Sequence, residues 1–371
     1  MAMAAANNIK PVRRLRNRLW SWLFTVAICI VNLHQRTQSP PVDSPLVEHN
    51  RTDGKYHGGG HVHDPLFTSE KVESGWDDRA IQLYNRTLDE LPQLGARNLT
   101  YWKFRHRGTF RVSNNQCGNH NFWEVASRGG WETDTFRIFE QYVNENETIV
   151  VDFGTWIGPT LIHHGSFSKR SIGIEADPVA YAVAEYNVEL NKAHRSWGDR
   201  VTVDSGCVAS PEDKGVLEMK AAKFPGASMS GIGEKVARNV AAVWTVYCYT
   251  LPELFEEYWH IERPYHDVII KIDVESYECK LIPSFYDWLK DEEHLPKMFM
   301  SFHPDIQYCT NEEYEGVLKF LRLYDHVLFD NKVEFGALRT ATGEEFRKLI
   351  DSRKTVVIYQ NHHAEKFPNR E

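Results

Sequence analysis

Residues 148–159 read TIVVDFGTWIGP, and this stretch decides the fold class. It begins as an apolar run that ends at Asp152 and continues as a D-x-G-x-x-x-G turn with Gly154 and Gly158. The first glycine allows a tight turn and the close approach of a ligand, and the second allows a helix to pack closely on a strand. Pro159 suits the first turn of a helix. We therefore expect a strand, a ligand-binding turn and a helix in direct succession.

A second apolar run, 171–176, carries a carboxylate near its end. Glu175 is at the position from which a carboxylate can hold both hydroxyls of a ribose. Together with the glycine turn, it predicts an adenosine-like ligand over the carboxyl ends of the strands. A nicotinamide dinucleotide does not fit, because G-x-G-x-x-G is absent and Pro159 removes an N–H that a pyrophosphate would need. The plainer alternative is a strand, turn and helix that bind nothing.

Apolar runs and helix-like segments alternate along the rest of the chain, which is typical of a parallel α/β sheet. Strands are expected at 148–153, 171–176, 201–209, 267–274, 297–303, 326–330 and 355–360, and helices from about 160 and at 178–191, 251–259, 276–290 and 312–323. Two more strand-like runs, 215–220 and 243–249, form an excursion before the fourth strand. The sequence therefore predicts an α/β fold with a Rossmann-like, mostly parallel seven-stranded sheet and helices on both faces.

The net charge of −8 combines two unlike regions. Residues 1–18 hold five basic and no acidic side chains, whereas the rest of the chain holds 38 basic and 51 acidic side chains. An acidic excess of this size argues against binding to nucleic acid, because basic groups are what recognise the phosphates.

Residues 19–33, LWSWLFTVAICIVNL, carry no charge and follow the basic tail directly. As a helix they would span about 22 Å, short of the roughly 30 Å hydrocarbon layer, although flanking side chains can extend that reach. We expect a signal anchor and a single-pass type II membrane protein of the Golgi or endoplasmic reticulum, with the bulk of the chain in the lumen. The alternative is a cleaved signal peptide and secretion.

Residues 34–75 are rich in Pro, Gly, Ser and charge and are expected to form a flexible stem. His57, His61 and His63 lie in this stretch, but the glycines between them do not preorganise ligands, so no metal site is expected. Residues 76–145 are rich in aromatic side chains and are expected to form a cap with a helix at 132–143.

Four N-glycosylation sequons, at Asn50, Asn85, Asn98 and Asn146, all precede residue 152. One of the six cysteines lies in the apolar segment, which leaves five for the body of the chain. Disulfides are compatible with a lumenal protein, but an odd number leaves at least one cysteine unpaired in a monomer, and the spacing does not assign the pairs.

Five blocks resemble successive motifs of the FkbM-type methyltransferases, a group within the class I S-adenosylmethionine (SAM)-dependent methyltransferases. The blocks are VDFGTWIG at 151–158, IGIEADPVAYAVAEYNVELN at 172–191, TLPELF at 250–255, IIKIDVESYE at 269–278 and SFHPD at 301–305. The resemblance covers about 130–360, and KIDVE is its most specific part. Trp156 and Ser276 depart from the residues that are usual in the family.

The resemblance implies a SAM-dependent methyltransferase domain over 146–371 and assigns roles to single residues. It implies that Asp152, Gly154 and Gly158 line the methionine part of SAM, that Glu175 holds its ribose, that Asp177, Cys207 and Val208 lie near the adenine, and that Glu132 approaches the cofactor. Asn187 and Asn191 match recurrent asparagines of the family, and we expect them to cap and pack rather than to bind a ligand.

Acceptor groups are expected at the carboxyl ends of strands four and five, next to the cofactor crevice. Asp273, Glu275 and His303 are the catalytic candidates, for orientation of an acceptor hydroxyl and removal of its proton. The alternatives are that Asp273 caps the helix beginning near Ser276 and that His303 is an ordinary loop residue. Glu278 is expected to be structural, and 228–231 (SMSG) is expected to be a solvated loop rather than part of the acceptor site.

The leading functional hypothesis is a lumenal, membrane-anchored O-methyltransferase that acts on a hydroxyl of a glycan or glycoconjugate, the abundant hydroxyl substrates of that compartment. A lumenal glycosyltransferase with a sugar-nucleotide donor is the first alternative, because Asp273-Val-Glu275 is similar to a metal-binding D-x-D. The second alternative is a non-catalytic, methyltransferase-like protein that binds a partner through 101–139.

Overall fold

The computed structural model describes residues 75–101, 104–106, 108–114, 121–221, 223–232, 240–275, 277–303, 309–329, 333–334, 340–352 and 355–360. The expected basic tail and signal anchor, and the expected stem up to residue 74, lie outside the described residues. Within these ranges, no helix has both the length and the apolar character needed to cross a membrane. The interpretations of 1–74 therefore stay predictions.

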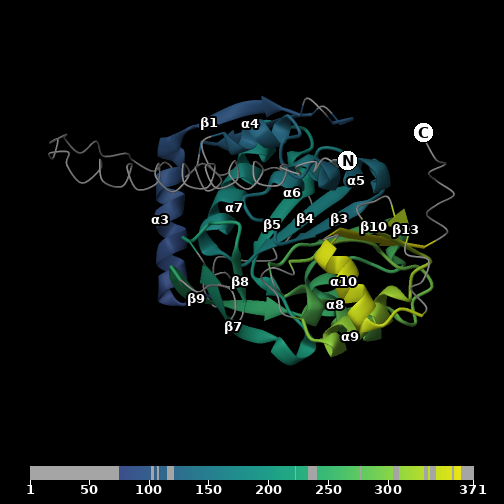
Figure 1. Cartoon of the computed structure of the whole chain (residues 1–371). Helices are drawn as coiled ribbons and strands as arrows, with labels where there is room; N and C mark the ends of the chain where they lie inside the picture. The colour runs from purple at the N-terminus through teal and green to yellow at the C-terminus, as the bar shows by residue number, and fades with distance from the viewer. Residues whose placement is uncertain are drawn as a thin grey trace, which may run out of the picture. The chain divides into compact units, whose positions relative to one another are not determined.

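A large, mostly parallel sheet forms the centre of the described fold (Figure 1). Its strands, in spatial order, are β13 (Val333–Glu334), β12 (His326–Phe329), β14 (Thr355–Tyr359), β11 (Lys297–Ser301), β10 (Val268–Ile272), β3 (Ile149–Phe153), β4 (Arg170–Glu175) and β5 (Val201–Ser205). From β11 to β5 every pairing is parallel, and β14 runs antiparallel between β11 and β12. The predicted mostly parallel α/β sheet is confirmed, and the short β13 extends it at one edge.

The order of the strands reverses between β3 and β10. The chain proceeds from β3 to β4 and β5 on one side and later returns to β10 and β11 on the other. The two strands pair in register, with Asp152 opposite Lys271 and Phe153 opposite Ile272, so their carboxyl ends lie next to each other. In open α/β sheets such a reversal opens a crevice in which ligands bind.

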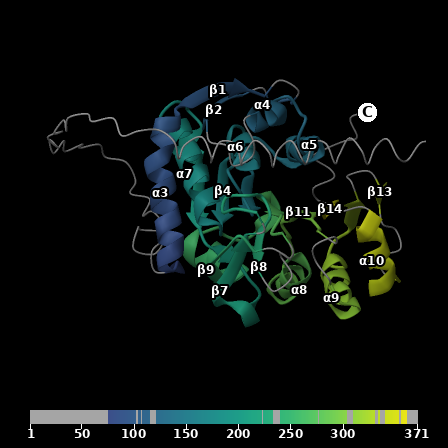
Figure 2. The ribbon, with the colours of Figure 1, turned by 60° about the vertical axis from the view of Figure 1, so that its left-hand side comes forward.

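Helices cover both faces of the sheet, as the apolar strands predict. α5 (Thr133–Tyr142) packs with Val150 and Ile269 on one face, while α8 (Glu278–Leu289) and α9 (Asn311–Leu321) pack with Val151 and Ile270 on the other. Figures 1 and 2 show α6 (Pro159–Gly165) and α7 (Pro178–Lys192) on the side of α5, and α10 (Gly343–Ser352) beside α9.

The excursion before β10 forms a second sheet of its own. Its order is β6 (Cys207–Val208), β9 (Ala242–Tyr249), β7 (Gly215–Ala221) and β8 (Ser230–Ile232). The single strand expected over 201–209 is wrong, because Gly206 adopts φ +134° and separates β5 from β6. The helix expected at 251–259 is a π-helix, η3 (Glu253–Tyr258), and 3₁₀ turns occur at η1 (Gly198–Arg200), η2 (Pro211–Asp213) and η4 (Tyr265–Asp267).

Two disulfides settle the pairing of the cysteines that the spacing left open. Cys207 is bonded to Cys248, its direct partner in the β6–β9 ladder, and Cys279 in α8 is bonded to Cys309. Cys117 lies outside the described residues.

The aromatic-rich segment packs on α6 and α7. It contains α3 (Asp78–Leu94), β1 (Ala96–Thr100), β2 (Thr109–Ser113) and α4 (Phe122–Ser127), followed by α5. Tyr101, Phe104, Phe110, Trp123 and Phe136 are buried together with Ile162 of α6 and Val183 of α7.

Side-chain amides join this segment to the sheet domain. The Asn187 Oδ1 accepts from Ser113 N at 2.8 Å, and its Nδ2 donates to the carbonyl of Ile157 at 3.0 Å. Asn191 makes the same kind of pair with Arg111, accepting from its N at 2.9 Å and donating to its O at 2.7 Å. The expected structural role of both asparagines is confirmed.

Candidate functional site

A cavity opens at the strand reversal. It contains about 600 Å³ of space not filled by protein atoms, including solvent at its mouth. The β3–α6 turn, the end of β4, the excursion sheet and the segment after β10 line it, and the predicted site residues among its lining are Gly154, Glu175, Cys207, Val208, Asp273 and Glu275. Its described lining holds three carboxylates and no Lys or Arg.

The glycine turn brings the ends of β3 and β10 into direct contact. Gly154 has φ +77°, and a Cβ built there would lie 1.8 Å from the carbonyl oxygen of Asp273, so only glycine fits. Gly158 has φ +91° and begins α6 as its N-cap, where an added Cβ would come no closer than 3.6 Å to Ile162. Gly158 shapes the turn from outside the cavity lining.

Trp156 joins this turn to the excursion sheet. Its backbone N donates to Glu175 Oε2 at 2.7 Å, and its indole Nε1 donates to the carbonyl of Gly226 at 2.9 Å. Its side chain also packs edge-on against Phe122 of the cap. The sequence marked Trp156 only as a departure from a family pattern, and nothing in the pattern indicated these contacts.

Glu175 lies at the end of β4 with both carboxylate oxygens facing backbone donors. Oε1 accepts from Asp177 N and Oε2 from Trp156 N, each at 2.7 Å. Burial raises the pKa of this carboxyl to about 7, against the opposing effect of these hydrogen bonds. Each oxygen has a second lone pair, so the group can still accept from ligand hydroxyls.

Asp177 lies outside the cavity lining and anchors the loop that covers it. As the N-cap of α7 it accepts from Val179 N at 2.9 Å and Ala180 N at 3.2 Å. Its second oxygen accepts from Gly226 N at 2.8 Å and from Ser230 Oγ at 2.7 Å. The solvated loop expected at 228–231 is therefore wrong, because Ser228, Ser230 and Gly231 line the cavity.

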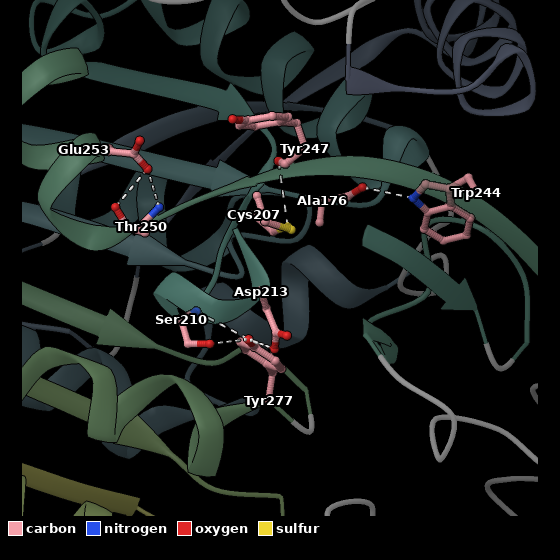
Figure 3. Close-up of a disulfide and its surroundings, with 10 residues drawn as sticks. Ala176, Cys207, Ser210, Asp213, Trp244, Tyr247, Thr250, Glu253 and Tyr277 are labelled. Carbon is pink, nitrogen blue, oxygen red and sulfur yellow. Dashed lines mark hydrogen bonds between the residues drawn. A yellow bond between two sulfur atoms is a disulfide. The ribbon is translucent and has the colours of Figure 1, made fainter. Parts of the chain in front are cut away.

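Residues of the excursion sheet and Tyr277 also line the cavity. Figure 3 shows the hydrogen bonds that hold this region together. The Trp244 indole donates to the carbonyl of Ala176 at 3.1 Å and holds β9 against the end of β4. The Tyr277 hydroxyl donates to Asp213 Oδ2 at 2.6 Å and accepts from Ser210 N at 3.3 Å. Cys207 contributes to this lining as a disulfide rather than as a free thiol.

A buried charge network lies beneath the turn. Lys271 Nζ is 3.0 Å from Asp152 Oδ1 and 3.3 Å from Asp273 Oδ2. Burial lowers the pKa of Lys271, but the charges of Asp152, Asp273 and Glu132 outweigh it and raise the pKa, so the ammonium stays charged. Asp152 is fully buried and also accepts from Thr160 Oγ1 at 2.5 Å, which makes it a support for the site rather than part of its lining.

Four side chains meet at the carboxyl ends of β10 and β11. His303 Nε2 is 3.4 Å from Asp273 Oδ1 and 3.7 Å from Glu275 Oε1, while its Nδ1 is 2.8 Å from Glu278 Oε1. Glu278 is fully buried and holds the imidazole, which agrees with the structural role expected for it. Asp273 does not cap α8, since the N-cap is Tyr277 and no side chain bonds there.

Two side chains of this cluster have raised pKa values and hold their protons at neutral pH. Burial lowers the pKa of His303, but Glu278, Glu275 and Asp273 outweigh it and raise that pKa to about 9. Burial raises the pKa of Glu275 to about 8, with support from the charges of Asp273 and Glu278. His303 is therefore an imidazolium at neutral pH unless another cation neutralises these carboxylates, which favours orientation over free general-base catalysis.

Backbone strain gathers around the same place. Three non-glycine residues adopt positive φ here, namely Glu132 at 39°, Trp156 at 51° and Glu275 at 41°. Strained backbone of this kind is concentrated at ligand-binding and catalytic sites. Glu132 is exposed as the N-cap of α5 and lies outside the cavity lining, although its charge acts on Lys271.

No family model and no curated protein matches the chain. The chain is similar to the crystal structure of methyltransferase FkbM from Methylobacillus flagellatus KT, with 12% identity, a TM-score of 0.31 and coverage of 76% of this chain and 59% of that one. It is also similar to an O-methyltransferase from Bacillus cereus in complex with SAH (13% identity, TM-score 0.30, 78% and 100% covered) and to geranyl diphosphate methyltransferase in complex with SAM (8%, 0.30, 67% and 95%). The fold assignment rests on the strand order, since TM-scores near 0.3 do not carry it.

The sequence missed several residues that build the site. Lys271 and Tyr277 fall within or beside KIDVE, so that motif was the available signal. Trp156 and the residues of the excursion sheet carried no such signal in the sequence, because their roles depend on contacts across the fold. The proposed roles of the lining residues toward a cofactor stay predictions.

Proposed function

We propose that the protein is a SAM-dependent methyltransferase that methylates a hydroxyl oxygen of a glycan or glycoconjugate in the secretory lumen. One observation supports SAM as the cofactor. The cavity at the strand reversal is lined by Glu175, Asp273 and Glu275 and by no Lys or Arg among its described residues. The described lining offers a pyrophosphate no Lys or Arg partner, whereas the sulfonium and amino groups of SAM are cations that carboxylates stabilise.

The residues around the cavity fit the parts of SAM. Gly154 lets the backbone come close to the methionine part, and Glu175 has lone pairs free for the ribose hydroxyls. Val208 and the disulfide-bonded Cys207 offer an apolar surface for the adenine. Asp177 supports this end indirectly, because it holds the loop around Gly226 in place.

We assign binding of the acceptor to the cluster of side chains that follows β10 and β11. When bound, SAM would supply its sulfonium methyl group to an acceptor oxygen as the carbon–sulfur bond breaks, leaving S-adenosylhomocysteine, and the hydroxyl proton would pass to Asp273. Asp273 accepts the hydrogen bond of the acceptor hydroxyl and orients its oxygen. His303, held by Glu278, keeps Asp273 and Glu275 in position and balances their charge.

Two disulfides support the lumenal setting, because such bonds persist in oxidising compartments and are rare in the cytosol. The apolar segment 19–33 and the four sequons agree with that setting. Glycans are the abundant hydroxyl compounds there, which is the reason for the proposed acceptor class.

A lumenal glycosyltransferase remains the second candidate because of one observation. Asp273, Glu275 and His303 offer three ligand atoms within 4.8 Å of one another, as a site for the metal of a sugar nucleotide would. The two candidates require different donors, so donor binding separates them.

Calorimetric titration of the full-length protein with SAM, NAD and UDP-glucose, the last with and without Mn²⁺, tests the proposal. We expect SAM alone to bind, and Glu175→Ala to weaken its affinity about 10- to 100-fold, because hydrogen bonds to a charged group contribute about 1.5–3 kcal/mol. Glu189→Ala, an exposed acid on α7, is the matched control and should leave the affinity unchanged. Binding of UDP-glucose without SAM, or a Glu175→Ala protein with normal SAM affinity, would overturn the proposed function.

A further inference from the structure

Asp273, Glu275 and His303 project from neighbouring parallel strands into one small space. Asp273 and Glu275 follow β10, and His303 follows β11, whose residues pair in register with those of β10. One ligand atom from each side chain lies within 4.8 Å of the other two. Each side chain is between 17% and 21% exposed, so an ion from solvent can reach all three.

The two distances from the His303 ring to the carboxylates are longer than hydrogen bonds and close to the separations of ligands around an ion. His303 Nε2 lies 3.4 Å from Asp273 Oδ1 and 3.7 Å from Glu275 Oε1. Hydrogen bonds from a ring nitrogen are about 2.7–3.2 Å long. Metal bonds of about 2.0–2.2 Å, at angles between octahedral and tetrahedral, hold their ligand atoms roughly 3–3.6 Å apart.

Glu278 provides an independent observation from outside the trio. It is fully buried, and its Oε1 binds His303 Nδ1 at 2.8 Å, which turns Nε2 toward the two carboxylates. Its Oε2 is buried and has no hydrogen-bond partner among the described residues. A carboxylate behind the second nitrogen of a histidine is the usual support of a metal-binding imidazole.

Acidic groups outnumber the basic groups nearby. Asp273, Glu275 and Glu278 surround one imidazole, and the Lys271 ammonium, 3.3 Å from Asp273, is shared with Asp152 at 3.0 Å. Glu275 Oε2 is buried without a hydrogen-bond partner among the described residues as well. Buried carboxylate oxygens that lack donors are expensive, and a cation removes that penalty.

We propose that Asp273, Glu275 and His303 bind a divalent transition-metal ion, with Glu278 as the support of the histidine. Two carboxylates and one imidazole suit Mn²⁺ or Zn²⁺, because carboxylates favour Mn²⁺ and imidazole favours Zn²⁺. Binding of the ion stands on these residues alone and extends the site beyond what methyl transfer requires.

A role for the ion in catalysis rests on the proposed function. Asp273 and Glu275 line the cavity, so the ion would border the place assigned to the acceptor hydroxyl. A divalent ion lowers the pKa of an oxygen bound to it, which helps a hydroxyl to lose its proton.

The test is titration of Mn²⁺, and separately Zn²⁺, into chelator-treated full-length protein, followed by calorimetry and by the electron paramagnetic resonance of Mn²⁺. We expect one ion per chain. His303→Ala and Glu275→Gln should weaken binding at least 100-fold, and Glu278→Gln about 10- to 100-fold. His266→Ala is the control, because His266 faces a single carboxylate, that of Asp267 at 3.0 Å, and should not change binding.

SAM affinity measured without metal keeps this inference separate from the proposed function. Normal SAM binding with no Mn²⁺ or Zn²⁺ bound at millimolar concentration, or metal binding that survives His303→Ala, overturns the metal site alone. Metal binding without SAM binding supports the metal site and overturns the proposed function. Circular dichroism of each variant establishes that it is folded, and the isosteric Glu275→Gln serves if His303→Ala is not.

Discussion

Gly154 is the residue on which the geometry of the site depends most directly. A Cβ there would meet the Asp273 carbonyl at 1.8 Å in a backbone with φ +77°. We expect Gly154→Ala to lower the free energy of unfolding by about 2–5 kcal/mol, the sum of left-handed strain and overpacking, and to abolish SAM binding. Urea denaturation and calorimetry measure the two effects.

Gly215 is the control for this substitution. It also has a positive φ, +116°, but no atom lies within 4 Å of the position of its Cβ. Gly215→Ala should cost only the backbone strain, about 1–2 kcal/mol, and leave SAM binding intact. Equal losses in the two variants would show that the contact with Asp273 does not matter.

The cluster around His303 makes stability depend on pH. The folded pKa of His303 is raised to about 9, so its stabilising contribution is complete below pH 6.5 and is lost as the pH rises through 9. The folded pKa of Glu275 is raised to about 8, so its contribution to stability also falls as the pH rises above 4.5. The free energy of unfolding of the full-length protein, measured in urea with chelator present, should fall by about 3–5 kcal/mol between pH 6.5 and 9.

Glu278→Gln tests the cause of that slope. Removal of the Glu278 charge returns the pKa of His303 toward its ordinary value, so the fall between pH 6.5 and 9 should become shallower. Glu189→Ala, on the exposed face of α7, should leave the slope as it is. A stability curve that stays flat or rises over this range in the unaltered protein would contradict the expectation.

At the scale of elements, the two disulfides hold different sides of the cavity. Cys207–Cys248 joins β6 to β9 beside the place assigned to the adenine, and Cys279–Cys309 joins α8 to the segment after His303. The bonds close loops of 41 and 30 residues, so each should contribute roughly 3–4 kcal/mol to stability. Loss of each bond should therefore destabilise the protein but disturb a different ligand.

The paired variants Cys207→Ser/Cys248→Ser and Cys279→Ser/Cys309→Ser test this division. The first should weaken SAM binding and spare metal binding, and the second should do the reverse. Urea denaturation and calorimetry measure stability and binding in the same samples. Two variants with the same binding defects would indicate that the disulfides stabilise only the fold as a whole.

At the scale of the whole molecule, glycosylation of the described sequons tests whether the protein enters the secretory lumen. Asn85 on α3, Asn98 and Asn146 are exposed. In a secretory host we expect glycans that peptide N-glycosidase F removes, and one fewer glycan in Asn85→Gln. No more than two of the six cysteines should react with a thiol reagent in the unreduced, denatured protein. Unglycosylated sequons together with six reactive thiols would refute the lumenal setting.

Local patterns in the sequence predicted most of the sheet but only part of the site. The alternation of apolar runs and amphipathic helices identified β3, β4 and β10, because burial of a strand on both faces leaves a continuous apolar run. The same logic failed at 201–209, where Gly206 interrupts the strand. Asp273 and His303 were identified because neighbouring parallel strands end at the same edge of the sheet.

By itself, the sequence determined the class of fold, the glycine turn and the carboxylates at the strand ends, since these follow from residue type and spacing along the chain. Only the tertiary structure decided which cysteines pair, that Trp156 and Asp177 hold the excursion against the turn, and that Glu278 orients His303. Those contacts join segments far apart in the chain or on different elements. Their energies depend on distance and burial in the folded state, which no local pattern encodes.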